Sequence, residues 1–195
     1  MKIEEICEKY NIRNYTINDD GSVDVDGDVF IYDEGLTEIP LNFNKVTGSF
    51  NVLENKITSL EGSPKEVGSF FDCRNNKLTS LSGGPELVGG DFYCGENNLT
   101  DLKGSPKEIG GRFGCVNTNI TSFVSDIKKL DGDFHCWGTP IGSIISITDL
   151  DFIKTFNTFR VLEDNVIYLK RLKYVMDLFE EPFSINMIEE YYTIK

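Results

Sequence analysis

The chain has 195 residues, of which 39% are apolar, and 32 acidic against 19 basic side chains give it a formal net charge of −13. No apolar run approaches the roughly 18 residues that a membrane-spanning helix needs. A surface this acidic repels phosphate, so we expect a globular protein that binds neither membranes nor nucleic acids.

The N-terminal segment predicts a short capping helix. Ile3, Ile6, Cys7 and Tyr10 fall on one face of a helix over residues 3–10. The segment lacks the apolar stretch of a secretion signal, and the five cysteines are an odd number. We therefore expect reduced thiols and a cytoplasmic location.

An acidic stretch follows this helix. The NDDG sequence at 18–21, with Val23 and Val25 after it, predicts a hairpin or an extra strand, so residues 1–26 are predicted to form the N-terminal cap. The stretch partly imitates a calcium loop, but its first ligand would be Ser22 and its last Asp33 rather than a glutamate. We favour turn formation and expect no metal or cofactor. Binding of a cation or nucleotide by residues 19–28, or near His135, stays open.

From Gly27 the sequence repeats every 21 residues, in six units that align without gaps. Five apolar columns run through the units: Val29, Phe50, Phe71, Phe92, Phe113, Phe134; Ile31, Val52, Cys73, Cys94, Cys115, Cys136; Leu36, Ile57, Leu78, Leu99, Ile120, Ile141; Ile39, Leu60, Leu81, Leu102, Phe123, Ile144; and Val46, Val67, Val88, Ile109, Leu130. One unit cannot bury such side chains alone, whereas stacked units form one continuous core.

The columns resemble the leucine-rich repeat, L-x-L-x-x-N-x-L-x-x-L. Phe and Cys take the first two apolar positions and Asn55, Asn76 and Asn97 the asparagine position, from which Glu34, Thr118 and Thr139 depart. The sequence pattern G-x-F-x-C-x-x-N-x-L-T-x-L is similar to that of short leucine-rich repeat proteins of bacteria and tailed phages. The resemblance covers residues 27–146 and implies a leucine-rich repeat solenoid of the α/β class, mostly β. It implies one parallel β-sheet of about six strands, a mainly irregular convex side and helical caps at both ends.

Buried asparagines at a repeated position are expected to hydrogen-bond backbone groups of the loops that leave the strands. Pro64, Pro85 and Pro106 recur on the return side, where their fixed φ favours an extended path.

After Asp149 the period stops. Helical spacing recurs at Leu150, Ile153 and Phe156, and VLEDNVIYL predicts a short hairpin around Asp164 and Asn165. A second helix is predicted from the spacing of Leu169, Leu172, Val175, Met176 and Phe179. Residues 147–195 are therefore predicted to form an α-rich C-terminal cap, with a role in binding left open.

The run DGDFHCWGTP places the single histidine, His135, beside Cys136 and the single tryptophan, Trp137. Strand alternation sends His135 and Cys136 to opposite faces, so we expect no nucleophile and base there. A straight column of four cysteines suits neither a tetrahedral zinc site nor disulfides, and buried free thiols are the expectation. Some secreted effectors join similar repeats to a ubiquitin-ligase domain with a catalytic cysteine, but no cysteine follows Cys136. We expect a non-enzyme.

Three rows of residues should point away from the core, and they vary where the columns do not. They are Asp28, Ser49, Phe70, Asp91, Arg112, Asp133; Phe30, Asn51, Asp72, Tyr93, Gly114, His135; and Tyr32, Leu53, Arg74, Gly95, Val116, Trp137. Exposed aromatic and arginine side chains are the usual anchors of protein interfaces. The candidate partner-binding residues are Phe30, Tyr32, Leu53, Phe70, Asp72, Arg74, Asp91, Tyr93, Arg112, Asp133, His135 and Trp137.

The leading hypothesis is a module that binds a partner protein through the concave face of the repeats, and a basic partner surface would fit the charge. The resemblance implies a phage or bacterial accessory protein that sequesters or inhibits a host factor, in the host cytoplasm if the protein is viral. The alternative is a structural protein that self-associates, with the solenoid face or end as a homo-oligomer interface.

Overall fold

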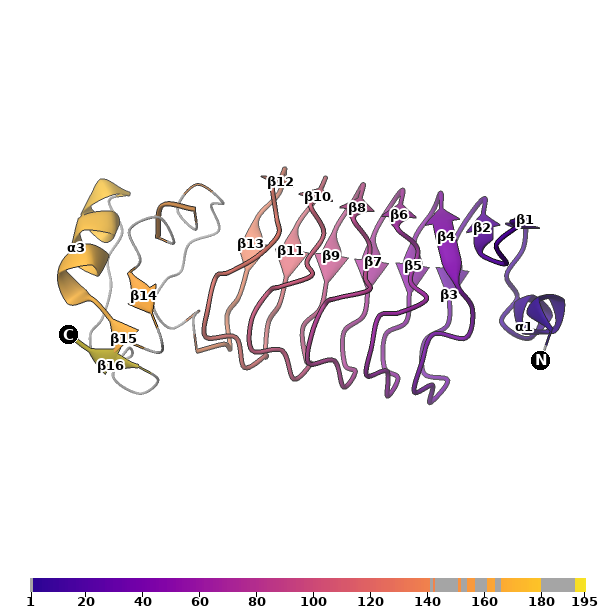
Figure 1. The fold of residues 1–195 in the computed structure, drawn as a ribbon, viewed down its shortest axis with the longest axis horizontal. Helices are drawn as coiled ribbons and strands as arrows, with labels where there is room; N and C mark the ends of the chain where they lie inside the picture. The colour runs from indigo at the N-terminus through magenta and orange to yellow at the C-terminus, as the bar shows by residue number, and fades with distance from the viewer. Residues whose placement is uncertain are drawn as a thin grey trace.

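The computed structural model describes residues 2–140, 142, 151, 154–156, 161–163, 166–179 and 192–195. The chain winds into a β-solenoid whose turns stack in a nearly straight row, with the termini at opposite ends (Figure 1). Neighbouring parallel strands pair residues 21 positions apart, as Phe50 pairs with Phe71. One repeat thus makes one turn, and the predicted repeat solenoid is confirmed.

One side of the solenoid is the six-stranded parallel sheet that the sequence predicts. Its strands are β3 (Val29–Phe30), β5 (Phe50–Asn51), β7 (Phe71–Asp72), β9 (Phe92–Tyr93), β11 (Phe113–Gly114) and β13 (Phe134–His135). The ladder continues beyond the assigned strands, since the Ile31 N–H donates to the Asn51 carbonyl (2.8 Å) and the Asp33 N–H to that of Leu53 (3.1 Å). This fixes which side chains point inward and which outward well past each two-residue strand.

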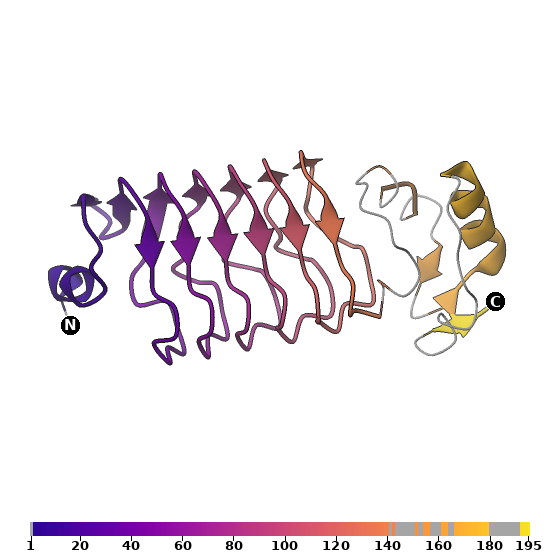
Figure 2. The same ribbon diagram turned by 180° about the vertical axis from the view of Figure 1, so that it is seen from behind.

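A second sheet lies along another side of the solenoid (Figure 2). The prediction of one parallel sheet did not include it. Its strands are β1 (Tyr15–Ile17), β2 (Val23–Val25), β4 (Phe43–Val46), β6 (Glu66–Val67), β8 (Leu87–Val88), β10 (Glu108–Ile109) and β12 (Lys129–Leu130). β1 pairs antiparallel with β2, and the other pairs are parallel. Most of these strands carry one inward apolar residue, such as Val67, beside an exposed neighbour such as Glu66, so their alternation is too short to identify from sequence.

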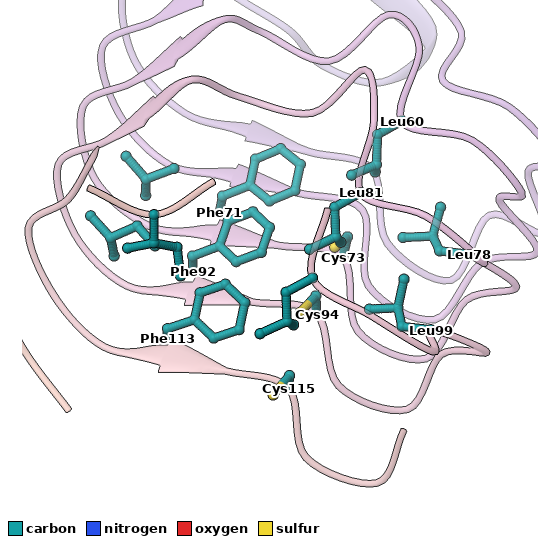
Figure 3. Packing of buried hydrophobic residues seen from close by; sticks show 14 of the residues in the cluster. Leu60, Phe71, Cys73, Leu78, Leu81, Phe92, Cys94, Leu99, Phe113 and Cys115 are labelled. Atoms are coloured by element: carbon teal, nitrogen blue, oxygen red, sulfur yellow. The ribbon is translucent and has the colours of Figure 1, made fainter. Parts of the chain in front are cut away.

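Straight ladders of identical side chains fill the core (Figure 3). The rings of Phe50, Phe71, Phe92, Phe113 and Phe134 stack with centroids 5.1 to 5.4 Å apart. Cys73, Cys94 and Cys115 are fully buried beside them, and Leu78 and Leu99 lie further along the same turns. All five predicted columns face the core; Leu36 and Leu130 are only partly buried, and Ile141 and Ile144 lie outside the described residues.

Buried asparagines join each turn to the one before it. The Asn76 amide donates to the Val52 carbonyl of the preceding turn (2.9 Å) and the Cys73 carbonyl of its own (3.2 Å). Its Oδ1 accepts from the Ile57 N–H (2.9 Å). Asn55 and Asn97 repeat this arrangement. The predicted role of the asparagines is confirmed, and it explains why the period is maintained so strictly.

The predicted N-terminal helix and hairpin are both present. Helix α1 (Ile3–Lys9) buries Cys7 and packs Ile3 and Ile6 against the core. β1 and β2 form the hairpin around residues 18–21, in a register that places Tyr15 opposite Val25.

The predicted C-terminal hairpin and second helix are present as well. β14 (Leu162–Glu163) pairs antiparallel with β15 (Val166–Ile167), β16 (Thr193–Ile194) lies parallel to β15, and α3 (Leu169–Leu178) buries Leu172, Val175 and Met176. Phe156 packs edge-on against Phe123 (centroids 5.4 Å apart), which attaches this part to the solenoid. The helical spacing of Leu150 and Ile153 lies outside the described residues. In the part of the chain that the structure describes, no helix is long and apolar enough to cross a membrane.

Candidate interaction surface

The candidate site is the side of the six-stranded sheet that points away from the core, here called the outer face. It consists of the three variable rows, because the alternation set by Phe50, Val52 and their counterparts points those rows away from the core. Four of their residues are nevertheless buried: Ser49, Asp72, Gly95 and Gly114. The turns stack in a nearly straight row in the projection of Figures 1 and 2. Strands at equal spacing on two sides of each turn leave neither side shorter than the other.

Three aromatic side chains of the outer face are largely exposed. Phe30 keeps 47%, Tyr32 56% and Trp137 63% of its surface accessible. Phe70 is half-buried, and its ring stacks against Phe30 with centroids 6.4 Å apart. Leu53, which follows Tyr32 in the ladder, is also half-buried. The predicted outward direction of these residues is confirmed.

Asp72 points outward but is only 3% exposed, because Arg74 covers it. The Arg74 guanidinium lies 2.6 Å from Asp72 Oδ2, and its Nε also donates to that carboxylate. Asp72 and Arg74 therefore form an internal ion pair, and Asp72 is not a free carboxylate of the surface.

Tyr93 is held on three sides. Its hydroxyl donates to Asp91 Oδ2 (2.5 Å), the Arg74 guanidinium lies over its ring (4.9 Å from the centroid), and the ring crosses Gly114 on the neighbouring strand. The hydrogen bond to Asp91 and partial burial raise the pKa of Tyr93. Partial burial acts to raise the pKa of Asp91, but hydrogen bonds from the Arg112 N–H and the Tyr93 hydroxyl outweigh it and lower that pKa. Tyr93 is thus a rigid, half-buried part of the surface.

The charges near the end of the outer face partly neutralise one another. Asp133 Oδ2 lies 4.0 Å from Arg112 Nε and 3.9 Å from His135 Nε2. Pairs this long and exposed contribute little stability. The His135 Nε2 atom is shielded from solvent and has no hydrogen-bond partner among the described residues.

His135 and Cys136 do not form a catalytic pair, because they point to opposite faces as expected. Cys136 is buried, and burial raises the pKa of its thiol to about 12. Burial also raises the pKa of Cys73, Cys94 and Cys115 well above the ordinary value. A thiol that stays protonated is a poor nucleophile and a poor metal ligand.

The acidic stretch near the N-terminus forms hydrogen bonds within turns and between strands. Asp20 Oδ1 accepts from the Ser22 N–H (2.9 Å), Asp24 Oδ1 from the Asn44 amide (2.8 Å) and Asp26 Oδ1 from the Thr47 hydroxyl (2.9 Å). Among the described residues, no group of three or more His, Cys, Asp or Glu side chains could hold a metal ion.

A hollow of about 640 Å³ lies beside the seven-stranded sheet, lined by small and charged residues that include Ser63, Lys65, Gly83, Glu86 and Lys107. Glu86 and Lys107 neutralise each other across it (2.5 Å). It offers no exposed aromatic anchor, so the outer face is the better candidate for recognition.

A column of corner residues borders the outer face, and the three predicted rows omit it. Asp33, Glu54, Asn75, Glu96 and Asn117 follow directly after the third row and have positive φ values of 52° to 56°. Their spacing of 21 residues was the signal available in the sequence.

Compared with protein-family models, curated proteins and solved structures, the chain has no match.

Proposed function

We propose that the chain is a non-enzymatic protein-binding module that recognises its partner with the outer face. The observation that carries this proposal is the exposure of Phe30, Tyr32 and Trp137 on the outer face of one sheet. Burying apolar surface contributes about 25 cal/mol of binding free energy per Å². A partner that covers a large exposed aromatic ring therefore gains a favourable contribution to binding.

The rigidity of the face supports the same function. The backbone ladder fixes the rows, and Tyr93 is already held by Asp91 and Arg74. A surface that is ordered before binding loses less conformational entropy when the partner arrives. The buried, protonated thiols support a non-catalytic role.

The proposal includes the resemblance to short leucine-rich repeat proteins of bacteria and tailed phages. On that basis the protein is an accessory protein that sequesters or inhibits a host factor in the cytoplasm. The 21-residue period and the asparagine ladder support the resemblance to leucine-rich repeats on which this assignment rests.

The test is recovery of binding proteins from an extract of the native host on the tagged full chain, quantified by mass spectrometry. The Tyr32→Ser/Trp137→Ser variant should recover the partner about tenfold less, since truncating two interface anchors costs well over 1 kcal/mol. The matched control is Leu87→Ser/Val124→Ser, which removes two side chains of 40% and 49% exposure that lie off the outer face. Equal recovery by all three folded proteins would contradict the proposal.

Self-association through the end of the solenoid is the second candidate, and strand β1 favours it. β1 lies at the edge of its sheet. The Asn18 N–H donates to the Ser22 carbonyl and the Asp26 N–H to that of Asn14, so alternation turns the backbone groups of Tyr15 and Ile17 toward the free edge. Two copies of β1 paired antiparallel about Thr16 would place Tyr15 opposite Ile17, which is 38% exposed. Light scattering at high micromolar concentration decides, since a monomer there excludes this function.

A further inference from the structure

The two halves of the outer face use their charges differently. In the half formed by β7 to β13, the carboxylates already have partners: Asp72 pairs with Arg74, Asp91 accepts from Tyr93, and Asp133 faces Arg112 and His135. Arg74 and Arg112 thus offset the charges of Asp72 and Asp133, and only Asp91, whose partner Tyr93 is neutral, keeps its charge uncompensated in these rows.

The first half carries a continuous apolar patch, here called the N-terminal patch, formed by Phe30, Tyr32, Leu53 and Phe70. Phe30 and Phe70 stack although they lie two turns apart, because the turn between them carries the small, buried Ser49. Tyr32 and Leu53 lie on adjacent strands of the ladder. The patch therefore extends across three turns.

Three carboxylates follow or precede residues of this patch in the repeat. Asp28 lies two residues before Phe30 and therefore points to the same face of the sheet. Asp33 follows Tyr32, and Glu54 follows Leu53. All three are exposed, and none takes part in an ion pair within 4.0 Å among the described residues. Asp28 accepts a hydrogen bond from the Ser49 N–H (2.7 Å), which leaves its negative charge uncompensated. We call Asp28, Asp33 and Glu54 the rim carboxylates.

Arg74 shows how a cation is held on this face. Its guanidinium pairs with the Asp72 carboxylate and lies over the Tyr93 ring. A ring and a carboxylate side by side bind a cation by two additive attractions. The repeat places Leu53 and Tyr32 at the positions equivalent to Arg74 in the two preceding turns, so the N-terminal patch has rings and carboxylates without the cation.

We propose that the partner docks on the N-terminal patch with a basic segment, in which arginine or lysine side chains alternate with large apolar ones. The apolar side chains cover Phe30, Tyr32 and Leu53, and the cations lie between the rings and the rim carboxylates. Phosphate-bearing surfaces do not fit, because carboxylates repel them. This inference rests on the proposed function and names the place and chemistry of the contact.

The probe is a short labelled peptide in which Arg alternates with Phe and Leu, and binding is measured by fluorescence anisotropy. A peptide with Glu in place of Arg, and one with Ser in place of Phe and Leu, should each bind about tenfold more weakly or less. The Asp33→Asn/Glu54→Asn variant should weaken binding of the basic probe by about threefold to tenfold, the expected range for two exposed ion pairs. Added salt should reduce the difference in probe affinity between the wild type and the double variant.

The corner column supplies a matched control. Glu96→Asn removes a carboxylate at the same position of the repeat, but beside the half that holds Arg74 and Arg112, and should change probe affinity less than about twofold. Asparagine already occupies this corner at Asn75 and Asn117, so the variants keep the backbone conformation. Equal weakening by Glu96→Asn, or none by the double variant, would overturn the proposal.

The native partner separates this inference from the proposed function. A partner that is lost with Tyr32→Ser/Trp137→Ser but retained fully by Asp33→Asn/Glu54→Asn overturns the basic-segment proposal and leaves protein binding intact. A partner lost with both variants supports both.

Discussion

The ring of Tyr93 lies across Gly114, and no other residue fits under it. A Cβ at position 114 would come within 2.9 Å of Tyr93 Cδ1. Asp91 holds the hydroxyl and Arg74 covers the ring, so the ring cannot move aside without losing one of these contacts. Gly114 therefore determines the conformation of the middle of the outer face.

Gly114→Ala should lower the free energy of unfolding by about 1–3 kcal/mol, the usual cost of forcing a methyl group into an occupied space. Urea unfolding measures this change. In a Tyr93→Ala background the same substitution should cost much less, because the ring is gone. An equal cost in both backgrounds would show that the contact is not responsible.

Asn76→Ala should be among the most destabilising single changes in the solenoid. It leaves the Ile57 N–H without its partner and removes one of the two asparagine amides that donate to each of the Val52 and Cys73 carbonyls, at a cost of about 2–3 kcal/mol. Asn76→Thr should cost about half as much, since Thr118 in the same column keeps one bond to its own turn (2.8 Å to the Cys115 carbonyl). The control is Asn98→Ala, an exposed asparagine of the next turn, and thermal unfolding should separate the three variants in that order.

In the corner column, replacing glutamate by asparagine and replacing asparagine by glutamate should change the free energy of unfolding in opposite directions. Glu54 has φ of 56° and Asn75 has φ of 52°, a region that asparagine tolerates better than glutamate. Glu54→Asn should therefore raise the free energy of unfolding and Asn75→Glu should lower it, each by about 1 kcal/mol. Shifts of the same sign in both variants would mean that charge, and not backbone conformation, dominates at this corner.

The buried thiols should make the protein less stable in alkaline solution. Burial raises the pKa of Cys73, Cys94 and Cys115 well above its ordinary value and that of Cys136 to about 12. In the unfolded chain thiols ionise near pH 8.5, about where the loss of stability begins, while the folded chain keeps its protons as pH rises further.

Each such thiol contributes about 1.4 kcal/mol of lost stability per pH unit in that range. Cys94→Val, which places in the column the residue already present at Val52, should make the decline with pH shallower. Urea unfolding at a series of pH values measures the slope, and an unchanged slope in Cys94→Val would rule out this origin.

Much of the fold follows from the sequence because each core column occupies one position of a fixed period. The Phe50 and Cys73 columns predicted the first sheet, and Asn76 predicted hydrogen bonds to the loops that leave the strands, although not that these bonds also join neighbouring turns. The second sheet was missed because a strand such as Glu66–Val67 contains one inward residue, and one residue has no periodicity.

The sequence predicted which side chains of the outer face point away from the core, but not how much of each is exposed to solvent. Alternation alone places Phe30, Tyr32 and Trp137 outward, and they are exposed. It also places Asp72 outward, yet Asp72 is buried, because whether a long neighbour such as Arg74 folds over it depends on side-chain contacts and not on spacing.

The separation of inward columns from outward rows has a genetic consequence. A duplication or deletion of one whole 21-residue unit leaves every ladder intact, whereas any other length breaks all of them at once. Each added unit would lengthen the solenoid by one strand spacing, about 4.8 Å, and move Trp137 that much further from Tyr32. Substitutions at the exposed positions of the rows leave the cross-section of the turn unchanged, so what the protein recognises can diverge between lineages much faster than how it folds.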